Sequence, residues 1–288
     1  MGRPYAEVIG DPIAHSKSPL IHNFWLGKLG IDAEYRACRV RWSEIWDYCA
    51  QRKADPQWVG CNVTMPLKHW AAANVDFVDR AVFSSRAANV IVKSNELLLG
   101  HNTDVFGVAE PLLKRAKPPY AGHVTTYAHI IGAGGAASAA ALGFSQAGYN
   151  GLDIYFYNRT VERARSLAEQ FPGNPDFGMS LDDFGGTNLP VNGDQAYSAV
   201  VFNASPLGMI GQPSLEVSLE TFHDDTIVFD MVYSPLETPL LAEARRRGMR
   251  TIDGLEMLVG QAAAAFEHFF GQPAPREHDA ELRALLTA

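Results

Sequence analysis

The stretch IIGAGGAASAAALGF, residues 130–144, decides the fold of this chain. It runs from an apolar, strand-like segment through three glycines into an alanine-rich helix. Gly132, Gly134 and Ala137 fit the pattern G-x-G-x-x-G/A. The first position allows a tight turn, the second lets a pyrophosphate approach the backbone, and the third permits close packing of helix on strand. The pattern predicts a dinucleotide site at the N-terminus of the helix. The alternative is a tightly packed glycine turn that binds nothing.

The end of the next predicted strand indicates which dinucleotide is bound. An enzyme that uses NAD usually has Asp or Glu here, which accepts a hydrogen bond from the ribose 2′-hydroxyl. This chain instead has Asn158, Arg159 and Thr160, with Arg163 one turn further on. Arginine pairs with a 2′-phosphate as a charged fork, whereas an acidic side chain would repel it. The residues therefore favour NADP over NAD, unless the two arginines only form a solvated face at the start of a helix.

Apolar runs alternate with helical segments through the second half of the chain. Such alternation predicts a parallel sheet with helices on both faces. The segment 171–195 is loop-rich, and KPPYAG, residues 117–122, has the composition of a linker. The predicted strands are 128–131, 152–157, 199–205, 226–233 and 249–254, and the predicted helices after the glycine turn are 161–171 and 255–270.

Residues 1–105 show a similar alternation, and the length of 288 residues suits two domains of ordinary size. The fold class expected is therefore α/β with two domains. Ser43 is a predicted N-cap for the second helix of this part. The predicted strands are 5–10, 34–40, 58–64 and 97–100, and the predicted helices are 19–30, 43–53, a short one after Pro66, and 105–116.

Composition and charge exclude several classes of function. The net charge of −8, with no basic cluster longer than Arg245-Arg246-Arg247, argues against a nucleic-acid surface. No apolar run approaches the roughly 18 residues that a membrane span needs, and the N-terminus is too polar for a signal peptide. The three cysteines form no C-x-x-C pair and the nine histidines show no metal-binding spacing. We therefore expect a cytoplasmic protein with free thiols and no metal.

Two serines near the N-terminus stand where a predicted helix begins. Ser18 before Pro19 is a favourable helix start, because serine caps free N–H groups and proline suits the first turn. That interpretation leaves Ser16 without a role. The other interpretation is an anion site, in which both hydroxyls help the positive end of the helix to hold a carboxylate.

Polar side chains also follow two later predicted strands. Asn62 and Thr64 are two residues apart in CNVTMPLK, so they share one face of a strand, and Lys68 follows on the next turn. Asp104 ends the motif HNTD, residues 101–104, directly before a helix. Each motif alone has an ordinary explanation, since a lysine is usually a solvated charge and Asp104 could cap the helix.

In combination, these motifs resemble the shikimate dehydrogenase family over nearly the whole chain. The matching blocks, in chain order, are SKSP at 16–19, NVTMPLK at 62–68, Asn89, NTD at 102–104, the glycine turn, NRT at 158–160, FNASPLGM at 202–209, DMVYSPLETPLL at 230–241 and DGLEMLVGQAAAAFE at 253–267. The resemblance implies a substrate-binding and catalytic domain formed by 1–105 and 256–288, whose sheet is mainly parallel. It also implies a Rossmann-type NADP-binding domain at 106–255, with the C-terminal helices returning to the first domain.

The resemblance also implies roles for individual residues. It makes Lys68 and Asp104 the catalytic pair, and it makes the hydroxyls of Ser16 and Ser18 ligands of the substrate carboxylate. The other substrate-binding residues implied are Asn62, Thr64, Asn89, Tyr233 and Gln261. The cofactor-binding residues implied are Gly132, Gly134, Gly135, Ala136, Asn158, Arg159, Thr160 and Arg163.

This set of residues suits the reduction of a ketone on a hydroxylated ring acid. Hydride transfer leaves negative charge on the ketone oxygen, which a cationic lysine stabilises and protonates. A carboxylate such as Asp104 would orient the lysine, and the Ser, Thr, Asn and Gln side chains supply hydrogen bonds to ring hydroxyls. Three departures from the family pattern bear on the choice of substrate, namely Arg86-Ala87-Ala88 before Asn89, Val105 after NTD, and His69 after the lysine.

The sequence therefore predicts NADP-dependent interconversion of 3-dehydroshikimate and shikimate by a monomer or homodimer. One alternative is a quinate/shikimate or aminoshikimate relative of broader specificity. Another is a non-catalytic NADP-binding regulator, although Lys68 and Asp104 are both present. A methylenetetrahydrofolate dehydrogenase type would share the two-domain plan, but the Ser-x-Ser pair and NTD oppose it.

Overall fold

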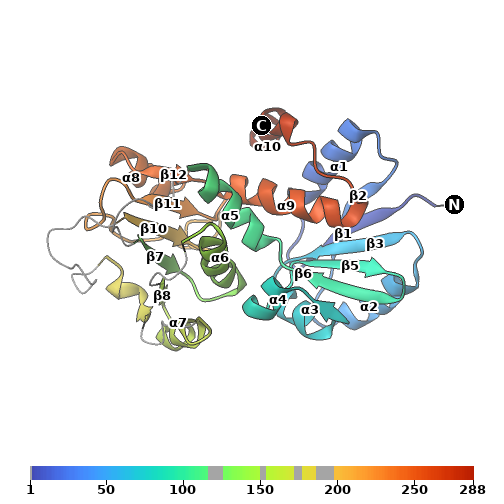
Figure 1. Cartoon of the computed structure of the whole chain (residues 1–288), viewed down its shortest axis with the longest axis horizontal. Coiled ribbons are helices and arrows are strands. Elements are labelled where there is room, and N and C mark those ends of the chain that lie inside the picture. Colours follow the sequence, from blue (N-terminus) through green and yellow to red (C-terminus); the bar gives the residue numbers. More distant parts are fainter. Residues whose placement is uncertain (1, 116–125, 150–153, 172–176, 186–197) are drawn as a thin grey trace. The chain divides into compact units, whose positions relative to one another are not determined.

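The computed structural model describes residues 2–115, 126–149, 154–171, 177–185 and 198–288 (Figure 1). The chain divides into two compact units. Unit 1 is Met1–Phe106 with Val259–Ala288, and unit 2 is Gly107–Leu258.

Unit 1 is built on a six-stranded mixed sheet. Strand β1 lies between β2 and β3 and is parallel to both, whereas β5 is antiparallel to β3 and β6. The strand order is β2-β1-β3-β5-β6-β4, with β4 parallel to β6 at the edge. The strands are β1 Tyr5–Gly10, β2 Glu34–Arg39, β3 Trp58–Val63, β4 Phe77–Val78, β5 Val90–Ser94 and β6 Leu97–His101.

Helices cover both faces of the unit 1 sheet, because alternate residues of each strand are buried on opposite sides. Tyr5 and Ile9 of β1 pack in one core with residues of α2, α3 and α4, whereas Ala6 and Val8 pack with Phe269 of α9. Helices α2, α3 and α4 lie on one side of the sheet and α9 lies on the other (Figure 1). The helices of this unit are α1 Ser18–Leu29, α2 Ile45–Ala54, α3 Lys68–Asn74, α4 Arg80–Ser85, most of α9 Gly254–Phe270, and α10 Asp279–Thr287, which follows the short η2 Arg276–His278.

Unit 2 contains a six-stranded sheet in which every pair of neighbours is parallel. Its order is β12-β11-β10-β7-β8-β9, so the chain starts in the middle, runs to one edge and then returns to build the other half. This is the strand order of the doubly wound dinucleotide-binding fold. The strands are β7 Thr126–Ile131, β8 Ile154–Asn158, β9 Gly178–Ser180, β10 Ser198–Asn203, β11 Ile227–Asp230 and β12 Arg250–Ile252.

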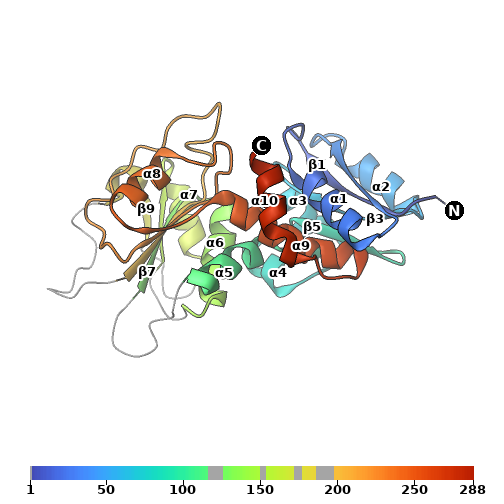
Figure 2. The ribbon, with the colours of Figure 1, turned by 90° about the horizontal axis from the view of Figure 1, so that it is seen from above.

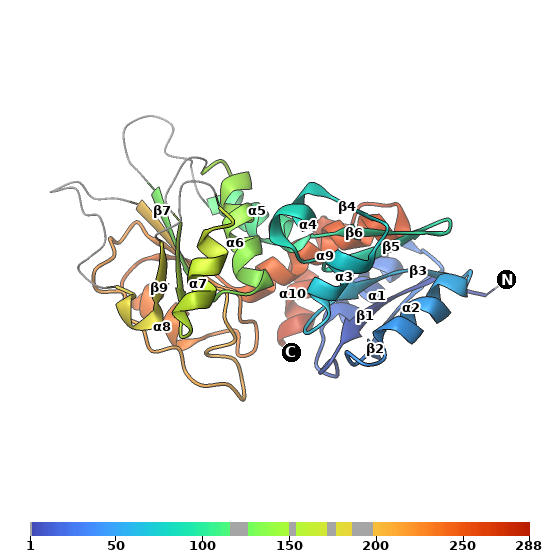
Figure 3. The same ribbon diagram turned by 90° about the horizontal axis from the view of Figure 1, so that it is seen from below.

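Helices flank the unit 2 sheet on both sides (Figures 2 and 3), and an apolar core lies on each of its faces. One contains Ala137, Ala140 and Phe144 of the alanine-rich helix, together with apolar residues of α5 and α7. The small alanines let this helix approach the strands closely. The other core contains Leu240 and Leu241 of the helix after β11. The helices are α5 Asp104–Arg115, α6 Gly135–Gln146, α7 Val161–Ala168 and α8 Pro239–Arg246, with the short η1 Leu181–Asp183.

Most predicted elements are confirmed, and the α/β class with mainly parallel sheets is confirmed as well. β4, α4 and β5 were not predicted, α8 and α10 were given no bounds, and the region that contains β9 and η1 was predicted to be loop-rich. Ser43 is not the cap of α2, because Glu44 occupies that position without a side-chain cap bond. The linker 117–122, residues 152 and 153 of the predicted strand, and most of 171–195 lie outside the described residues.

The core of unit 1 contains a histidine that burial keeps neutral. His22 is fully buried, and neither ring nitrogen has a hydrogen-bond partner among the described residues. Its ring stacks on Tyr35 with centroids 4.0 Å apart and an interplanar angle of 4°. Loss of solvation lowers the pKa of His22 from 6.5 to about 3. The folded protein therefore does not bind a proton that the unfolded chain accepts below pH 6.5.

Acid should destabilise the protein in part through this residue. As the pH falls from 7 to 5 only the unfolded state protonates at His22, which costs roughly 2 kcal/mol of folding free energy. The variant His22→Phe keeps a flat ring and removes this effect, so its loss of stability between pH 7 and pH 5 should be smaller by that amount. Urea unfolding at the two pH values measures the difference, and His15→Ala, at an exposed histidine, is the control. An unchanged pH dependence in His22→Phe would contradict this account.

Candidate active site

Ser16 lies before α1 and Ser18 lies within its first turn, so neither serine occupies the N-cap position of this helix. Lys17 occupies the N-cap position, and Ser18 is the first residue of the helix, so the prediction that Ser18 caps α1 is wrong. The Oγ of Ser16 instead accepts a 3.3 Å hydrogen bond from the Ser18 backbone N–H. The Ser18 side chain is buried, and its hydroxyl makes no hydrogen bond within the described part of the chain. This hydroxyl is therefore available to a ligand at the positive end of the helix.

Asn62 and Thr64 lie at the carboxyl end of β3. Asn62 is buried, and its Oδ1 accepts a 2.5 Å hydrogen bond from the hydroxyl of Tyr35. Its Nδ2 donates to the carbonyl of Asn89 over 3.3 Å. Thr64 is half-buried one residue beyond the strand. No role was predicted for Tyr35, because only the pairing of β1 with both β2 and β3 brings it near Asn62.

Lys68 and Asp104 form an ion pair. The lysine is the first residue of α3 and the aspartate is the first residue of α5, and Nζ lies 2.5 Å from Oδ2. The side chains are 22% and 9% exposed, so solvent screens the pair only in part. Asp104 does not serve as a cap, because its two oxygens accept from Lys68 and from Asn89. The backbone N–H of Asp104, at the start of α5, donates to Oδ1 of Asn102 over 3.1 Å.

Asn89 connects the ion pair to the C-terminal helix. Its Nδ2 lies 2.8 Å from Asp104 Oδ1 and 3.3 Å from Gln261 Oε1. Its Oδ1 accepts from the backbone N–H of Thr103 over 2.8 Å. Asn89, Thr103 and Gln261 are all buried. Three segments far apart in the sequence thus meet at one amide, which fixes the orientation of that amide.

Two of the departures from the family pattern contact each other. His69 Nδ1 lies 2.8 Å from the carbonyl oxygen of Arg86, so this ring nitrogen must carry the proton. Close by, the Ala88 N–H donates to the carbonyl of Lys68 over 3.0 Å. Arg86 has a φ of 53°, a conformation that glycine adopts more readily. The segment before Asn89 is therefore attached to the first turn of α3.

The glycine turn of unit 2 is tight at its first glycine and open at its second. Gly132 has a φ of 120°, and a Cβ there would come within 2.8 Å of the carbonyl oxygen of Ala204. A Cβ on Gly134 would meet nothing within 4 Å, so the space beside it is open. Helix α6 starts at Gly135, and no side chain in the described part of the chain caps it. Its leading N–H groups, including those of Gly135 and Ala136, fit an anionic phosphate.

The predicted selector residues follow β8. Arg159, Thr160 and Arg163 are exposed, and the Asn158 side chain donates to the carbonyl of Thr160 over 3.0 Å. Neither guanidinium has an ion-pair partner within the described ranges. Two such arginines at the end of the strand after the glycine turn fit a 2′-phosphate. Tyr233 follows β11 and is half-buried, and burial raises the pKa of its hydroxyl.

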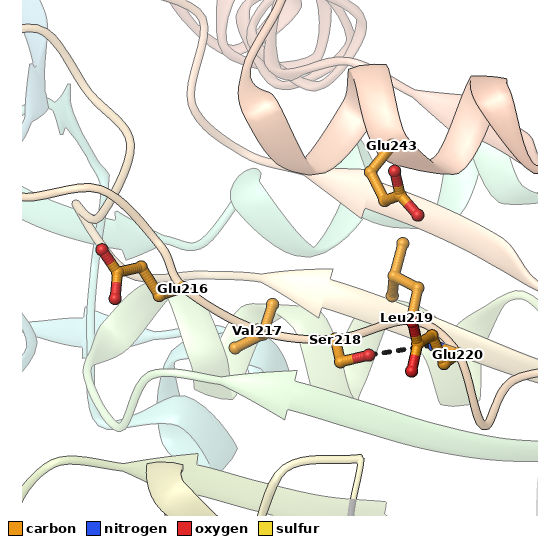
Figure 4. A pocket seen from close by; sticks show the side chains of 6 residues that line it. All are labelled: Glu216, Val217, Ser218, Leu219, Glu220 and Glu243. Carbon is orange, nitrogen blue, oxygen red and sulfur yellow. Dashed lines mark hydrogen bonds between the residues drawn. The ribbon is translucent and has the colours of Figure 1, made fainter.

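A separate pocket in unit 2 does not suit a phosphate. Its lining includes three carboxylates, Glu216, Glu220 and Glu243 (Figure 4). Glu243 is paired with Arg246 at 2.7 Å, which lowers the pKa of the carboxyl group. None of the predicted site residues lines this pocket. In the described ranges, no group of three or more His, Cys, Asp or Glu side chains could hold a metal ion.

The fold and these sites define the class of the protein. Unit 2 is a dinucleotide-binding α/β fold with an open glycine turn, and unit 1 carries a lysine–carboxylate pair among buried amides. A dinucleotide fold with a lysine–carboxylate pair suits a dehydrogenase that acts on a polar substrate. Within the described residues, no helix has the length and hydrophobicity that crossing a membrane requires.

Comparison with known proteins identifies the family. Residues 8–91 match the model of the shikimate dehydrogenase substrate binding domain, and residues 254–281 match that of the shikimate 5'-dehydrogenase C-terminal domain. The shikimate dehydrogenase (NADP(+)) of Sphingopyxis alaskensis is 45% identical over 99% of this chain and 97% of its own length. The chain belongs to the shikimate dehydrogenase family.

Solved structures of relatives have the same fold. A shikimate dehydrogenase in complex with NADP+ superposes with a TM-score of 0.83 at 30% identity, covering 99% of this chain and 96% of that one. Shikimate 5-dehydrogenase from Thermus thermophilus, in complex with NADP(H) and shikimate, gives a TM-score of 0.80 at 29% identity, with 98% and 99% covered.

Proposed function

We propose that this chain is an NADP-dependent dehydrogenase that interconverts 3-dehydroshikimate and shikimate. The observation that carries the proposal is the 2.5 Å contact between Lys68 and Asp104, held by Asn89, in a chain of this family. Relatives with the same fold were crystallised with NADP and with shikimate. Unit 1 would bind the ring acid and unit 2 the dinucleotide.

The polar side chains of unit 1 suit a ring acid that carries three oxygen substituents and a carboxylate. Ser16 and Ser18 are proposed to bind the carboxylate near the start of α1, where the helix dipole favours negative charge. The remaining side chains offer amide and hydroxyl groups to ring oxygens. The substrate-binding residues proposed are Ser16, Ser18, Asn62, Thr64, Asn89 and Gln261 of unit 1, and, on the family resemblance, Tyr233 of unit 2.

Lys68 is proposed to act on the oxygen that changes oxidation state. When bound, NADPH supplies the hydride that adds to the ketone carbon of 3-dehydroshikimate. The Lys68 ammonium donates a hydrogen bond to the ketone oxygen, stabilises the negative charge that grows there, and transfers a proton to it. Asp104 holds Nζ in place and balances its charge. In the reverse direction Lys68 takes the hydroxyl proton of shikimate.

Arg159 is proposed to select NADP through the 2′-phosphate. We expect Arg159→Ala to raise the KM for NADP by roughly 10- to 100-fold, because a hydrogen bond to a charged group contributes about 1.5–3 kcal/mol. The KM for NAD should change little, since NAD has no 2′-phosphate. Steady-state rates with each dinucleotide measure the shift. Arg165→Ala, at an exposed arginine of α7, the helix that follows Arg159, is the matched control. Equal KM changes for both dinucleotides would contradict the selector role.

The substrate assignment is tested by comparing kcat/KM for shikimate and quinate, each with NADP and with NAD. The proposal expects shikimate with NADP to be the preferred combination. Comparable rates on quinate would instead favour the relative of broader specificity, for which Arg86-Ala87-Ala88 beside Asn89 would be the first segment to examine.

We further propose that the protein works in the reducing cytoplasm as a monomer or homodimer. Cys38, Cys49 and Cys61 are all free, and the last two are buried. Burial raises the pKa of Cys49 to about 11, so its thiol stays protonated and unreactive at neutral pH. Free, protonated thiols suit a compartment in which disulfides do not persist.

A further inference from the structure

The hydroxyl of Tyr35 is aimed at one atom of the candidate site. It lies 2.5 Å from Oδ1 of Asn62, and the two residues are only 2% and 5% exposed. Burial raises the pKa of Tyr35 well above its usual value, so the hydroxyl keeps its proton and donates it to the amide oxygen. This contact between β2 and β3 crosses β1, where the residue paired with Tyr35 is the small Ala6.

The Tyr35 ring has little freedom to move away from Asn62. One side stacks on the buried ring of His22 at 4.0 Å, and Phe269 of α9 packs against it at 6.2 Å. The backbone of Tyr35 is held by Asn23, which accepts from its N–H over 2.9 Å and donates to its carbonyl over 2.8 Å. The ring and the backbone of Tyr35 are therefore both held in place before any ligand binds.

These contacts decide which way the Asn62 amide points. The oxygen accepts from Tyr35, and one hydrogen of Nδ2 donates to the Asn89 carbonyl. A flipped amide would place its oxygen against that carbonyl, which also only accepts. The second N–H of Asn62 has no acceptor among the described residues. A donor in a buried position without a partner is costly unless a ligand supplies an acceptor.

We propose that Tyr35 is a positioning residue, which orients Asn62 so that its free N–H donates to an oxygen of the substrate. This inference rests on the proposed function and deepens it, because it assigns Asn62 as a donor and not an acceptor. The ligand group that Asn62 contacts is then a carboxylate or hydroxyl oxygen with a free lone pair. Tyr35 itself touches no substrate.

The test is the variant Tyr35→Phe, which removes one oxygen and keeps the stacked ring. The KM for shikimate should rise about tenfold, because the orientation of one hydrogen bond is lost, while kcat changes less than about twofold. The KM for NADP should not change. Tyr48→Phe is the matched control, because Tyr48 is a buried tyrosine of the same unit that donates to Glu7 Oε2 over 2.7 Å and contacts no predicted site residue. Tyr48→Phe should leave the KM for shikimate unaltered.

A second variant, Asn62→Asp, keeps the oxygen that Tyr35 holds and removes the donor. It should raise the KM for shikimate at least as much as Tyr35→Phe does, and combining the two changes should add less than about twofold. An unchanged KM in either single variant, an equal KM rise in Tyr48→Phe, or full additivity would overturn the proposal. Failure of the wild-type protein to oxidise shikimate would instead overturn the proposed function itself, so the two failures are distinguishable.

Discussion

Lys68→Ala is expected to lower kcat for shikimate oxidation by ~10²–10⁴-fold, the usual contribution of a positioned general acid or base. Lys68 Nζ has one carboxylate partner at 2.5 Å and lies at the start of α3, where Asn89 and Asp104 also converge. Alanine removes both the charge and the proton donor. Because the glycine turn and Arg159 belong to unit 2, the dissociation constant for NADP should stay within about twofold of wild type. Steady-state kinetics and a binding titration measure the two effects separately.

Lys93→Ala is the control for this variant. Lys93 is a lysine of the same unit that donates to the backbone carbonyl of Asp55 over 2.8 Å, and it contacts no predicted site residue. Its replacement should leave kcat unchanged. Wild-type turnover in Lys68→Ala would remove Lys68 from the chemistry, and an equal fall in Lys93→Ala would show that the loss reflects general damage.

Asp104→Asn is expected to have the second largest effect, a fall in kcat of ~10²-fold or more. The substitution keeps the shape of the side chain but removes the negative charge that faces Lys68. An amide that presents N–H to the ammonium also repels it, so Nζ would leave its position. Part of the contact with Asn89 survives, since the new amide still offers one oxygen. Initial rates at saturating shikimate and NADP measure the change.

Asp55→Asn is the matched control, because Asp55 is also a carboxylate that accepts two hydrogen bonds in unit 1. Its partners are the Tyr5 hydroxyl and the Gln57 backbone N–H, neither of which belongs to the candidate site. Stability should fall slightly in this variant and kcat should not. If Asp104→Asn kept full turnover, the carboxylate would have only a structural role.

The nucleotide-binding unit was predictable because its signals are local. The strand, glycine turn and helix of residues 126–146 are contiguous, and the tight turn predicted at Gly132 matches its positive φ and its close approach to Ala204. The short strand β9 was not predictable. It has three residues, too few for a periodic pattern, and it is fixed by close packing of Gly178 against the Arg165 backbone on α7.

Predicted caps failed where a tertiary partner competed for the side chain. Asp104 would satisfy local N–H groups in an isolated helix, but Lys68 and Asn89 take both of its oxygens. Ser18 lies one residue too far along α1 to cap it, and Ser16 accepts the N–H instead. Local capping rules describe the most favourable partner within a few residues, and a functional site supplies stronger ones from further away.

The hydrogen bonds of Asn62 and Asn89 depend on which strands pair and in which register. They could not be predicted from the spacing of residues along the sequence. Tyr35 on β2 and Asn62 on β3 lie on either side of β1. Their side chains meet across β1, where the residue paired with Tyr35 is the small Ala6. Thr103 was visible within the NTD motif, yet its contacts with Asn89 and Gln261 required the C-terminal helix to return to unit 1. The family resemblance named most of these residues without naming their partners.

The most direct test of the account is the stoichiometry of the reaction itself. The full-length protein is incubated with shikimate and NADP, the formation of NADPH is followed by absorbance, and the organic product is identified by mass spectrometry. The account predicts one NADPH for each shikimate converted into a product two hydrogen atoms lighter, and almost none with Lys68→Ala. No NADPH from protein that still binds NADP and shikimate would contradict it.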